Sequence, residues 1–251
     1  SDQLGALSTD QVPALSTQSV AALSSAQFVG LNTDDIQALG TDQAKVLNSA
    51  QLGGLGTEQV AAFATDDFAQ LSTNALRGLG SAQINALTTD QIVAFSSQQV
   101  ASLTTQQVAG LRTDQIAALQ TEDLRALGTA AIRSLSTEQV AALGTEQMST
   151  LSSAQIAALA TTPLNQVGAI GTEDIKAMTT DQFRVMSSAQ VRGLGTEQIS
   201  QIDTDDLQAL TTTALRGLTT DQVAALTTDQ IVGLSTLQAA SLTTHQLAGL
   251  R

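Results

Sequence analysis

The chain has 251 residues, of which 42% are hydrophobic and 2% aromatic, and its 23 acidic and 10 basic side chains give a net charge of −13. Without Cys it has no disulfides, cysteine-ligated zinc, iron–sulfur cluster or cysteine nucleophile, and its one His offers little for a metal site or a catalytic triad. The apolar fraction excludes a disordered acidic tail, and the acidity disfavours nucleic acid and anionic lipid as partners. No run of 18 apolar residues occurs, so we expect no membrane insertion.

An eight-residue repeat runs along the chain. An apolar residue, usually leucine, recurs at every eighth position from Leu7 to Leu159, and after a step of 11 residues the series continues from Ile170 to Leu250. We call this position a and the next seven b to h. Position c is always Ser or Thr, e is mostly Gln, f is mainly Val, Ile or Leu, and h is usually Ala or Gly. The mean spacing of the a and f residues is about four, so an apolar stripe would drift by about 80° per octad on an α-helix, which excludes one continuous helix.

Each octad is predicted to form one short helix and a tight turn. Ser or Thr at c followed by an acid at d is typical of a helix start, and Gly or Asn at b, as at Gly40, is typical of a left-handed C-cap. Bases concentrate at g, which places Asp42/Lys45, Glu173/Lys176 and similar pairs three residues apart. Helices of five or six residues persist only when stacked, so the predicted fold is an all-α solenoid, with two octads forming a coil of 16 residues. A β-solenoid is the alternative, because f is often β-branched.

The predicted organisation is a single solenoid over residues 1–251 with a register break at about 160–169. Residues 160–165 interrupt the octads and are expected to form a bulged loop or a kink, because Pro163 lacks a donor N–H. Residues 33–91 and 172–230 match at an offset of 139, which indicates growth by copying blocks of octads. Neither end resembles a polar capping repeat, so we expect the array to continue in a longer protein or to associate end to end.

The requirements of folding explain the residue types at most octad positions. The glutamine row at e is expected to bridge backbone groups left open at the turns, and c is committed to capping. No nucleophile accompanies His245, so we expect no enzyme and no catalytic or cofactor-binding residue. Adjacent acids offer weak candidates for a Ca²⁺ site, without an EF-hand or other calcium-loop pattern. These candidates are Asp34, Asp35, Asp66, Asp67, Asp205 and Asp206.

The run Leu218–Leu226, with the sequence LTTDQVAAL, resembles the short tandem repeats of very large secreted or surface proteins of Gram-negative bacteria. The resemblance covers the whole chain but rests on a low-complexity motif. It implies an extracellular or cell-surface stalk, an adhesin or a filament component.

Two functions from different classes follow. The first is a non-enzymatic structural repeat protein that serves as a stalk, spacer or self-assembling surface filament. The second is an extracellular module that binds a protein or glycan, with Ca²⁺ as an optional aid. Ice binding by the threonine rows is a lesser alternative, because stacked helices lie much farther apart than strands. The candidate interaction residues are arginines at position g. They are Arg77, Arg125, Arg133, Arg184, Arg192 and Arg216.

Overall fold

A computed structural model describes residues 7–250, which contain 28 α-helices of four to six residues, one short 3-10 helix and no β-strand. The predicted all-α solenoid is therefore confirmed, and the β-solenoid alternative is wrong. Contacts divide the chain into an N-terminal unit, Ser1–Leu127, and a C-terminal unit, Gly128–Arg251, and each is described by itself. No helix in residues 7–250 is long and apolar enough to cross a bilayer.

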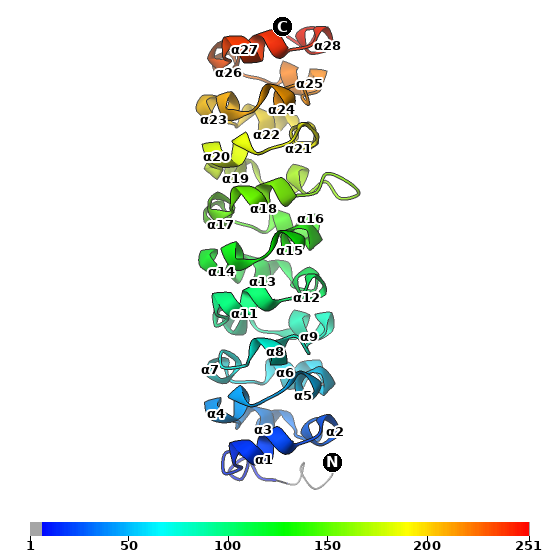
Figure 1. Cartoon of the computed structure of the whole chain (residues 1–251), viewed down its shortest axis with the longest axis vertical. Helices are drawn as coiled ribbons and strands as arrows, with labels where there is room; N and C mark the ends of the chain where they lie inside the picture. Colours follow the sequence, from blue (N-terminus) through cyan, green and yellow to red (C-terminus); the bar gives the residue numbers. More distant parts are fainter. Residues whose placement is uncertain (1–6, 251) are drawn as a thin grey trace. The chain divides into compact units, whose positions relative to one another are not determined.

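The helices follow one another at octad intervals (Figure 1). The N-terminal unit contains α1 (Thr17–Ala22), α2 (Ser25–Phe28), α3 (Thr33–Gln37), α4 (Thr41–Lys45), α5 (Ser49–Gly54), α6 (Thr57–Ala61), α7 (Thr65–Phe68), α8 (Thr73–Leu76), α9 (Ser81–Ala86), α10 (Thr89–Val93), α11 (Ser97–Ser102), α12 (Thr105–Ala109), α13 (Thr113–Ala118) and α14 (Thr121–Ala126). The C-terminal unit contains α15 (Thr129–Ser134), α16 (Thr137–Ala141), α17 (Thr145–Thr150), α18 (Ser153–Ala158), η1 (Val167–Ala169), α19 (Thr172–Ala177), α20 (Thr180–Arg184), α21 (Ser188–Gly193), α22 (Thr196–Ser200), α23 (Thr204–Ala209), α24 (Thr212–Leu215), α25 (Thr220–Ala224), α26 (Thr228–Gly233), α27 (Thr236–Ser241) and α28 (Thr244–Leu247).

Every α-helix begins at the Ser or Thr of position c, but this residue is the first helical residue and not the cap. The N-cap is position b, whose backbone is extended, as at Ser96 (φ −80°, ψ 154°). The predicted left-handed C-cap at b is wrong, since Gly40 has φ −98° and ψ 164° and no described residue has a positive φ. The reason is that the helix closes one residue earlier. The N–H of position a bonds the carbonyl of f, as from Leu47 to Ala44 at 3.2 Å, so b is free to start the next helix.

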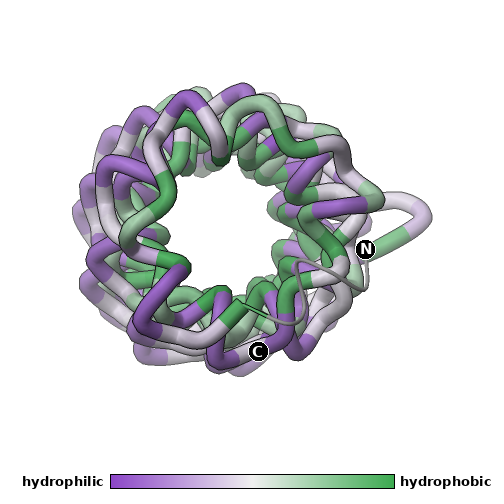
Figure 2. Tube along the Cα trace, turned by 90° about the horizontal axis from the view of Figure 1, so that it is seen from below, coloured by the Kyte–Doolittle hydropathy of each residue, from purple (hydrophilic) through white to green (hydrophobic). Residues whose placement is uncertain are grey.

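Each superhelical turn contains between three and four octads. The main contacts join a helix to the third helix along the chain, as between α2 and α5 and between α11 and α14. The predicted coil of two octads is therefore wrong. The extended residues at a and b turn each helix only partway around the ring, so more octads are needed before the chain lies against itself. Apolar residues gather on the inner side of the ring and polar residues on its outer side (Figure 2).

The core is made by positions a and f. Each f side chain from Val12 to Val223 is at most 1% exposed, and the a side chains from Leu31 to Leu218 are at most 8% exposed. A small residue at h lets successive turns approach closely, because a Cβ on Gly110 would lie 2.8 Å from the Cβ of Ser81. Burial of this continuous apolar strip is what stabilises helices that are too short to persist alone.

The register break is a loop that leaves the solenoid within the C-terminal unit (Figure 1). Residues 159–166 contain no helix, and the peptide bond between Thr162 and Pro163 is cis. Gln166 closes the base of the loop: its Oε1 accepts from Ala160 N at 2.6 Å, and its own N–H donates to Ala160 O at 3.0 Å. Residues 160–165 therefore lie in this loop, outside the octad pattern.

Candidate functional site

The repeated polar feature of both units is the glutamine at position e, the third residue of its helix. In α10, Gln91 accepts from the N–H of Thr88 through Oε1 at 3.0 Å, and so caps its own helix. Its Nε2 donates to the carbonyls of Val60 at 3.3 Å and Phe63 at 2.9 Å, which end α6 one superhelical turn earlier. One amide therefore caps two helix ends in different turns, as the sequence predicts for this row.

The same pattern recurs along both units, and we call it the glutamine ladder. Its Nε2 atoms reach the carbonyl of a residue 28 positions earlier and one 30 or 31 positions earlier. In the C-terminal unit, Gln166, Gln182 and Gln190 reach 31 and 34 positions back, and the spacing returns to 28 and 31 at Gln198. The extruded loop therefore adds three residues to the chain without interrupting the ladder.

Aspartate replaces glutamine at five e positions, and these carboxylates are buried. Asp35, Asp67, Asp123, Asp174 and Asp206 are between 0% and 8% exposed. The aspartate oxygen can still cap its own helix, as Asn32 N donates to Asp35 Oδ2 at 3.1 Å, but an ionised carboxylate has no donor for the earlier turn. Asp35 Oδ1 and Asp123 Oδ2 are buried without a hydrogen-bond partner.

Burial sets the protonation behaviour of four of these groups. Loss of hydration raises the pKa of Asp67, Asp123, Asp174 and Asp206, and a neighbouring acid raises the pKa of each further. A hydroxyl one turn away opposes this effect at two of them. Ser97 Oγ donates to Asp123 Oδ1 and Thr180 Oγ1 donates to Asp206 Oδ1, both at 2.7 Å.

The adjacent acids named as weak Ca²⁺ candidates point in different directions. Asp34, Asp66 and Asp205 at position d are exposed, whereas Asp35, Asp67 and Asp206 at position e are buried. Residues 7–250 contain no group of three or more His, Cys, Asp or Glu side chains placed to share a metal ion. A calcium ion takes six to eight oxygens, so a diverging pair makes a poor ligand set.

The candidate arginines are exposed but occupy different environments. Arg77 and Arg216 donate through Nε to the last carbonyls of α11 and α27, at 3.4 Å to Ser102 and 3.0 Å to Ser241. These two contacts are equivalent in the internal duplication. Arg184 pairs with Asp181 at 2.6 Å, with the same i,i+3 spacing as the pairs Lys45/Asp42 and Lys176/Glu173. Arg125 lies on α14.

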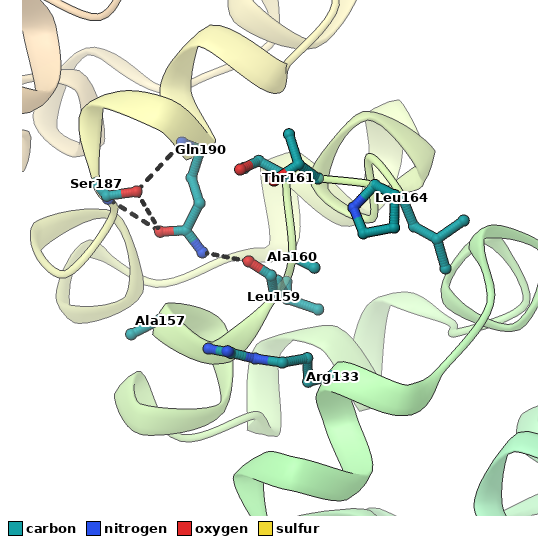
Figure 3. A pocket seen from close by; sticks show the side chains of 10 residues that line it. Arg133, Ala157, Leu159, Ala160, Thr161, Leu164, Ser187 and Gln190 are labelled. Carbon is teal, nitrogen blue, oxygen red and sulfur yellow. Dashed lines mark hydrogen bonds between the residues drawn. The ribbon is translucent and has the colours of Figure 1, made fainter.

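Arg133 and Arg192 line hollows in the C-terminal unit. Arg192 and Arg216 share an open hollow that includes Ser188 and Thr213. Arg133 lies below the extruded loop, in a hollow of about 340 Å³ bounded by α18, the loop and the start of α21 (Figure 3). Leu164 on this loop is 44% exposed, a feature that the octad pattern gave no reason to expect.

The hollow beneath the loop has an apolar wall and a polar wall. Leu159, Pro163 and Leu164 supply apolar surface, and no acid lines the hollow. On the opposite side Ser187 and Gln190 bond each other, and Gln190 Nε2 donates to Leu159 O at 3.1 Å (Figure 3). These amide and hydroxyl groups are already paired, so Arg133 is the charged group that this hollow offers to a ligand.

These features define a class: tandem-repeat α-solenoids built from octads and joined by glutamine amides between turns. The chain belongs to the ALTTAQ repeat family, whose model matches residues 28–65, 60–97, 93–121, 116–153, 167–201 and 199–236. The letters of that description correspond to positions h, a, b, c, d and e, as in residues 225–230, ALTTDQ, and end on the ladder glutamine. The six segments leave out residues 154–166, which contain the extruded loop. The comparison with curated proteins gives no match.

Proposed function

We propose that this protein is a non-enzymatic structural element, a stalk or spacer at the bacterial cell surface or outside the cell. The observation that carries the proposal is the ladder, because it commits the polar position e to holding one turn on the next. Positions a, b, c, f and h are committed to the core, the caps and close packing. In such an array each repeat contacts only near neighbours, so length follows the number of repeats.

A pair of deletions tests the spacer function. Removal of residues 81–112 takes out four octads and keeps every later glutamine in phase with the ladder. Removal of residues 81–108 takes out fewer residues but shifts the octad phase by half a repeat. We expect the first variant to stay helical, with a proportionally smaller maximum dimension by small-angle X-ray scattering, and the second to lose helix by circular dichroism.

The size of the intact chain at high dilution provides the second readout. A compact globule of this length has a radius of gyration of about 18 Å. A spacer must exceed that value clearly, and a measured value near it would contradict the proposal. Labelling of intact cells with an antibody against the chain tests its surface location.

A binding module is the second candidate, and the hollow with Arg133 favours it. A guanidinium beside Leu159, Pro163 and Leu164 suits a ligand that carries a carboxylate next to an apolar group. A glycan array and a peptide array are the screens. Saturable binding that is lost in Arg133→Ala but kept in Arg77→Ala would support this function over a purely structural one.

A further inference from the structure

The basic residues at position g fall into two groups, which are separated by the residue at position d of the same helix. Where d is an acid, the two side chains can pair, as Arg184 does with Asp181. Arg192 and Arg216 belong to the other group, because alanine and threonine occupy position d of their helices. Within residues 7–250 neither of these two arginines forms an ion pair. Their charges are therefore not neutralised by their own helices.

Arg192 and Arg216 line one open hollow of about 560 Å³ between α21 and α24, which belong to successive turns of the C-terminal unit. Asp221 lines a neighbouring hollow with Arg192 but forms no ion pair with it. Two positive charges thus share a hollow whose own wall contains no acid, in a chain with a net charge of −13. The other residues of this wall are Ser188, Ala189, Thr213 and Gly217.

The guanidinium of Arg216 is held in place by the fold. Its Nε donates to Ser241 O at 3.0 Å, and its two terminal nitrogens make no hydrogen bond within residues 7–250. Gly217, the next residue, lies directly against α21, because a Cβ on it would overlap the carbonyl oxygen of Ser188. The free N–H groups of Arg216 are therefore positioned before any ligand binds, which lowers the entropic cost of binding.

Arg192 supplies the second guanidinium, whose nitrogens make no hydrogen bond within the described part of the chain. Side chains at position g reach the turn that follows, as Gln208 Nε2 does in donating to Gly233 O. The same direction carries Arg192 toward α24. The hydroxyls of Ser188 and Thr213 also have no hydrogen bond among the described residues, so the hollow offers two guanidinium groups and two hydroxyls as donors.

The internal duplication provides a comparison, because the equivalent place in the N-terminal unit has only one arginine. Arg77 corresponds to Arg216 and makes the equivalent bond to the last carbonyl of α11. Gly53 stands at the position that corresponds to Arg192. The bond that caps the helix of the next turn therefore requires only the first arginine, and folding gives no role to the charge of the second.

We propose that the hollow with Arg192 and Arg216 binds a doubly charged oxyanion, the phosphate or sulfate group of a small ligand. A guanidinium presents paired N–H donors that match the oxygens of such a group, and its charge strengthens the hydrogen bonds. Two guanidinium groups balance two negative charges, whereas a carboxylate carries only one. The inference goes beyond the proposed structural function, and its site is separate from the hollow that contains Arg133.

The test is a titration of the intact chain with inorganic phosphate and with inorganic sulfate, followed through the arginine Nε–Hε signals in NMR spectra. The titration is run at about pH 8, where phosphate is doubly charged, and at constant ionic strength, so that binding is separated from screening. The signals of Arg192 and Arg216 are expected to shift and to saturate. Acetate is expected to bind at least about tenfold more weakly.

Glucose 6-phosphate distinguishes the two sources of such a group. Tighter binding than that of inorganic phosphate would identify the ligand as an ester whose sugar also contacts the hollow. Weaker binding would identify it as the free ion. Both results support the site, because each requires the same two arginines.

Glutamine variants remove one charge each and keep the helices. Glutamine is the native residue at position g in α23, where Gln208 bonds the following turn, so the variants are expected to retain the wild-type circular dichroism spectrum. Arg192→Gln and Arg216→Gln are each expected to weaken phosphate binding by about tenfold or more. Their own Nε–Hε signals are lost, which assigns the signals followed in the titration.

Two matched controls carry the same change of charge in the same unit. Arg184→Gln removes an arginine that is paired with Asp181, and Arg133→Gln removes an arginine that lines a different hollow. Both are expected to bind phosphate as the wild type does. An equal loss in either control would overturn the inference, because it would show that net charge alone attracts the anion. Absence of saturable binding, or acetate binding as tight as that of phosphate, would also overturn it. The spacer function is judged separately, from the dimensions of the chain.

Discussion

Two neighbouring regions of the N-terminal unit solve the same problem differently. In α9–α13 every e position is a buried glutamine, and each amide bonds the carbonyls of the turn before. In α7 and α8 the e positions are Asp67 and Ala75, and no glutamine among residues 7–250 donates to the carbonyls of Leu39 and Leu47. Phe68 of α7 belongs to an aromatic cluster that extends into the following turn. Phe68 packs against Phe63 and Phe95, with ring centroids 6.2 and 5.4 Å apart.

The difference shows that a turn without ladder bonds to the turn before it is still held to the turn after it by amide bonds and ring contacts together, since Gln99 donates to Ala69 and Leu71 and Phe68 contacts Phe95. A buried aromatic contact adds stabilisation beyond its burial, about 0.5–1.5 kcal/mol per pair, which is comparable to the net value of one hydrogen bond. The α7–α8 region lacks amide bonds to the turn before it and has both amide bonds and a ring contact with the turn after it. The comparison leads to four predictions.

The largest effect is expected from Phe68→Ala, which removes a fully buried ring from the region that donates no ladder bond to the turn before it. Loss of burial and the cavity left behind should lower the free energy of unfolding by about 3–5 kcal/mol. Phe183→Ala is the matched control, because Phe183 is equally buried at position f but makes no aromatic pair within residues 7–250. Urea unfolding of both variants measures the difference, and an equal loss would show that the cluster adds nothing.

Gln91→Met tests the ladder region. Methionine retains the apolar stem but leaves the carbonyls of Val60 and Phe63 without their amide donor and the Thr88 N–H without its acceptor. Unsatisfied buried polar groups should lower the free energy of unfolding by about 2–3 kcal/mol. Gln91→Glu restores the cap to Thr88 but not the inter-turn bonds. If Gln91→Glu lowers the free energy of unfolding no more than a substitution of an exposed residue does, Gln91 does not hold one turn on the next.

Asp67→Gln gives α7 the glutamine that α9–α13 carry at position e. The longer amide restores a donor for the Leu39 carbonyl and removes a carboxylate whose pKa is raised by burial. We expect the free energy of unfolding to rise by about 1 kcal/mol. Asp66→Gln, one residue earlier on the exposed side, should change it little. A melting temperature that rises equally in both variants would show that net charge, and not the ladder, is responsible.

The smallest effect is a dependence of stability on pH. Asp67, Asp123, Asp174 and Asp206 have a pKa that is higher in the folded chain than in the unfolded chain, so the folded state binds protons more readily. Their contribution to stability is present at acidic pH and is lost as the pH rises through the folded pKa. The free energy of unfolding should therefore increase as pH falls from 7 toward 3.8, the ordinary pKa of an aspartate. Replacing the four aspartates with asparagine should flatten the dependence of the free energy of unfolding on pH. An unchanged slope would show that other groups cause this dependence.

Local signals in the octad predicted much of the fold but not its superhelix. Thr89 and its equivalents mark every helix start because capping is decided within a few residues. The same local signals predict that Gln91 bonds open backbone groups, since an amide at the third helical position has few backbone partners. The predicted number of octads per superhelical turn is wrong, because this number depends on small differences in the dihedral angles of extended residues such as Leu39 and Gly40. No residue type specifies those angles.

The candidate site was harder to predict than the fold. The sequence placed Asp34 and Asp35 together, but adjacent residues on a short helix face different directions, so one is solvated and the other buried. The sequence identifies the candidate arginines only by their shared position g. It could not distinguish Arg77, which caps a helix of the next turn, from Arg133, which lines a hollow formed only because the loop leaves the solenoid.

The extruded loop has a consequence for engineering. Gln166 bonds Ala160 at the other side of the loop base and also donates to the carbonyls of Ile132 and Leu135 in the turn before. The residues at the tip of the loop can therefore be changed without altering the ladder below it. A foreign peptide grafted between Thr161 and Leu164 would be displayed at a fixed height set by counting octads. Other octads would become display points if an insertion were followed by a glutamine in the place of Gln166. The position of a grafted epitope along the repeat could therefore be chosen by choosing the octad that carries it.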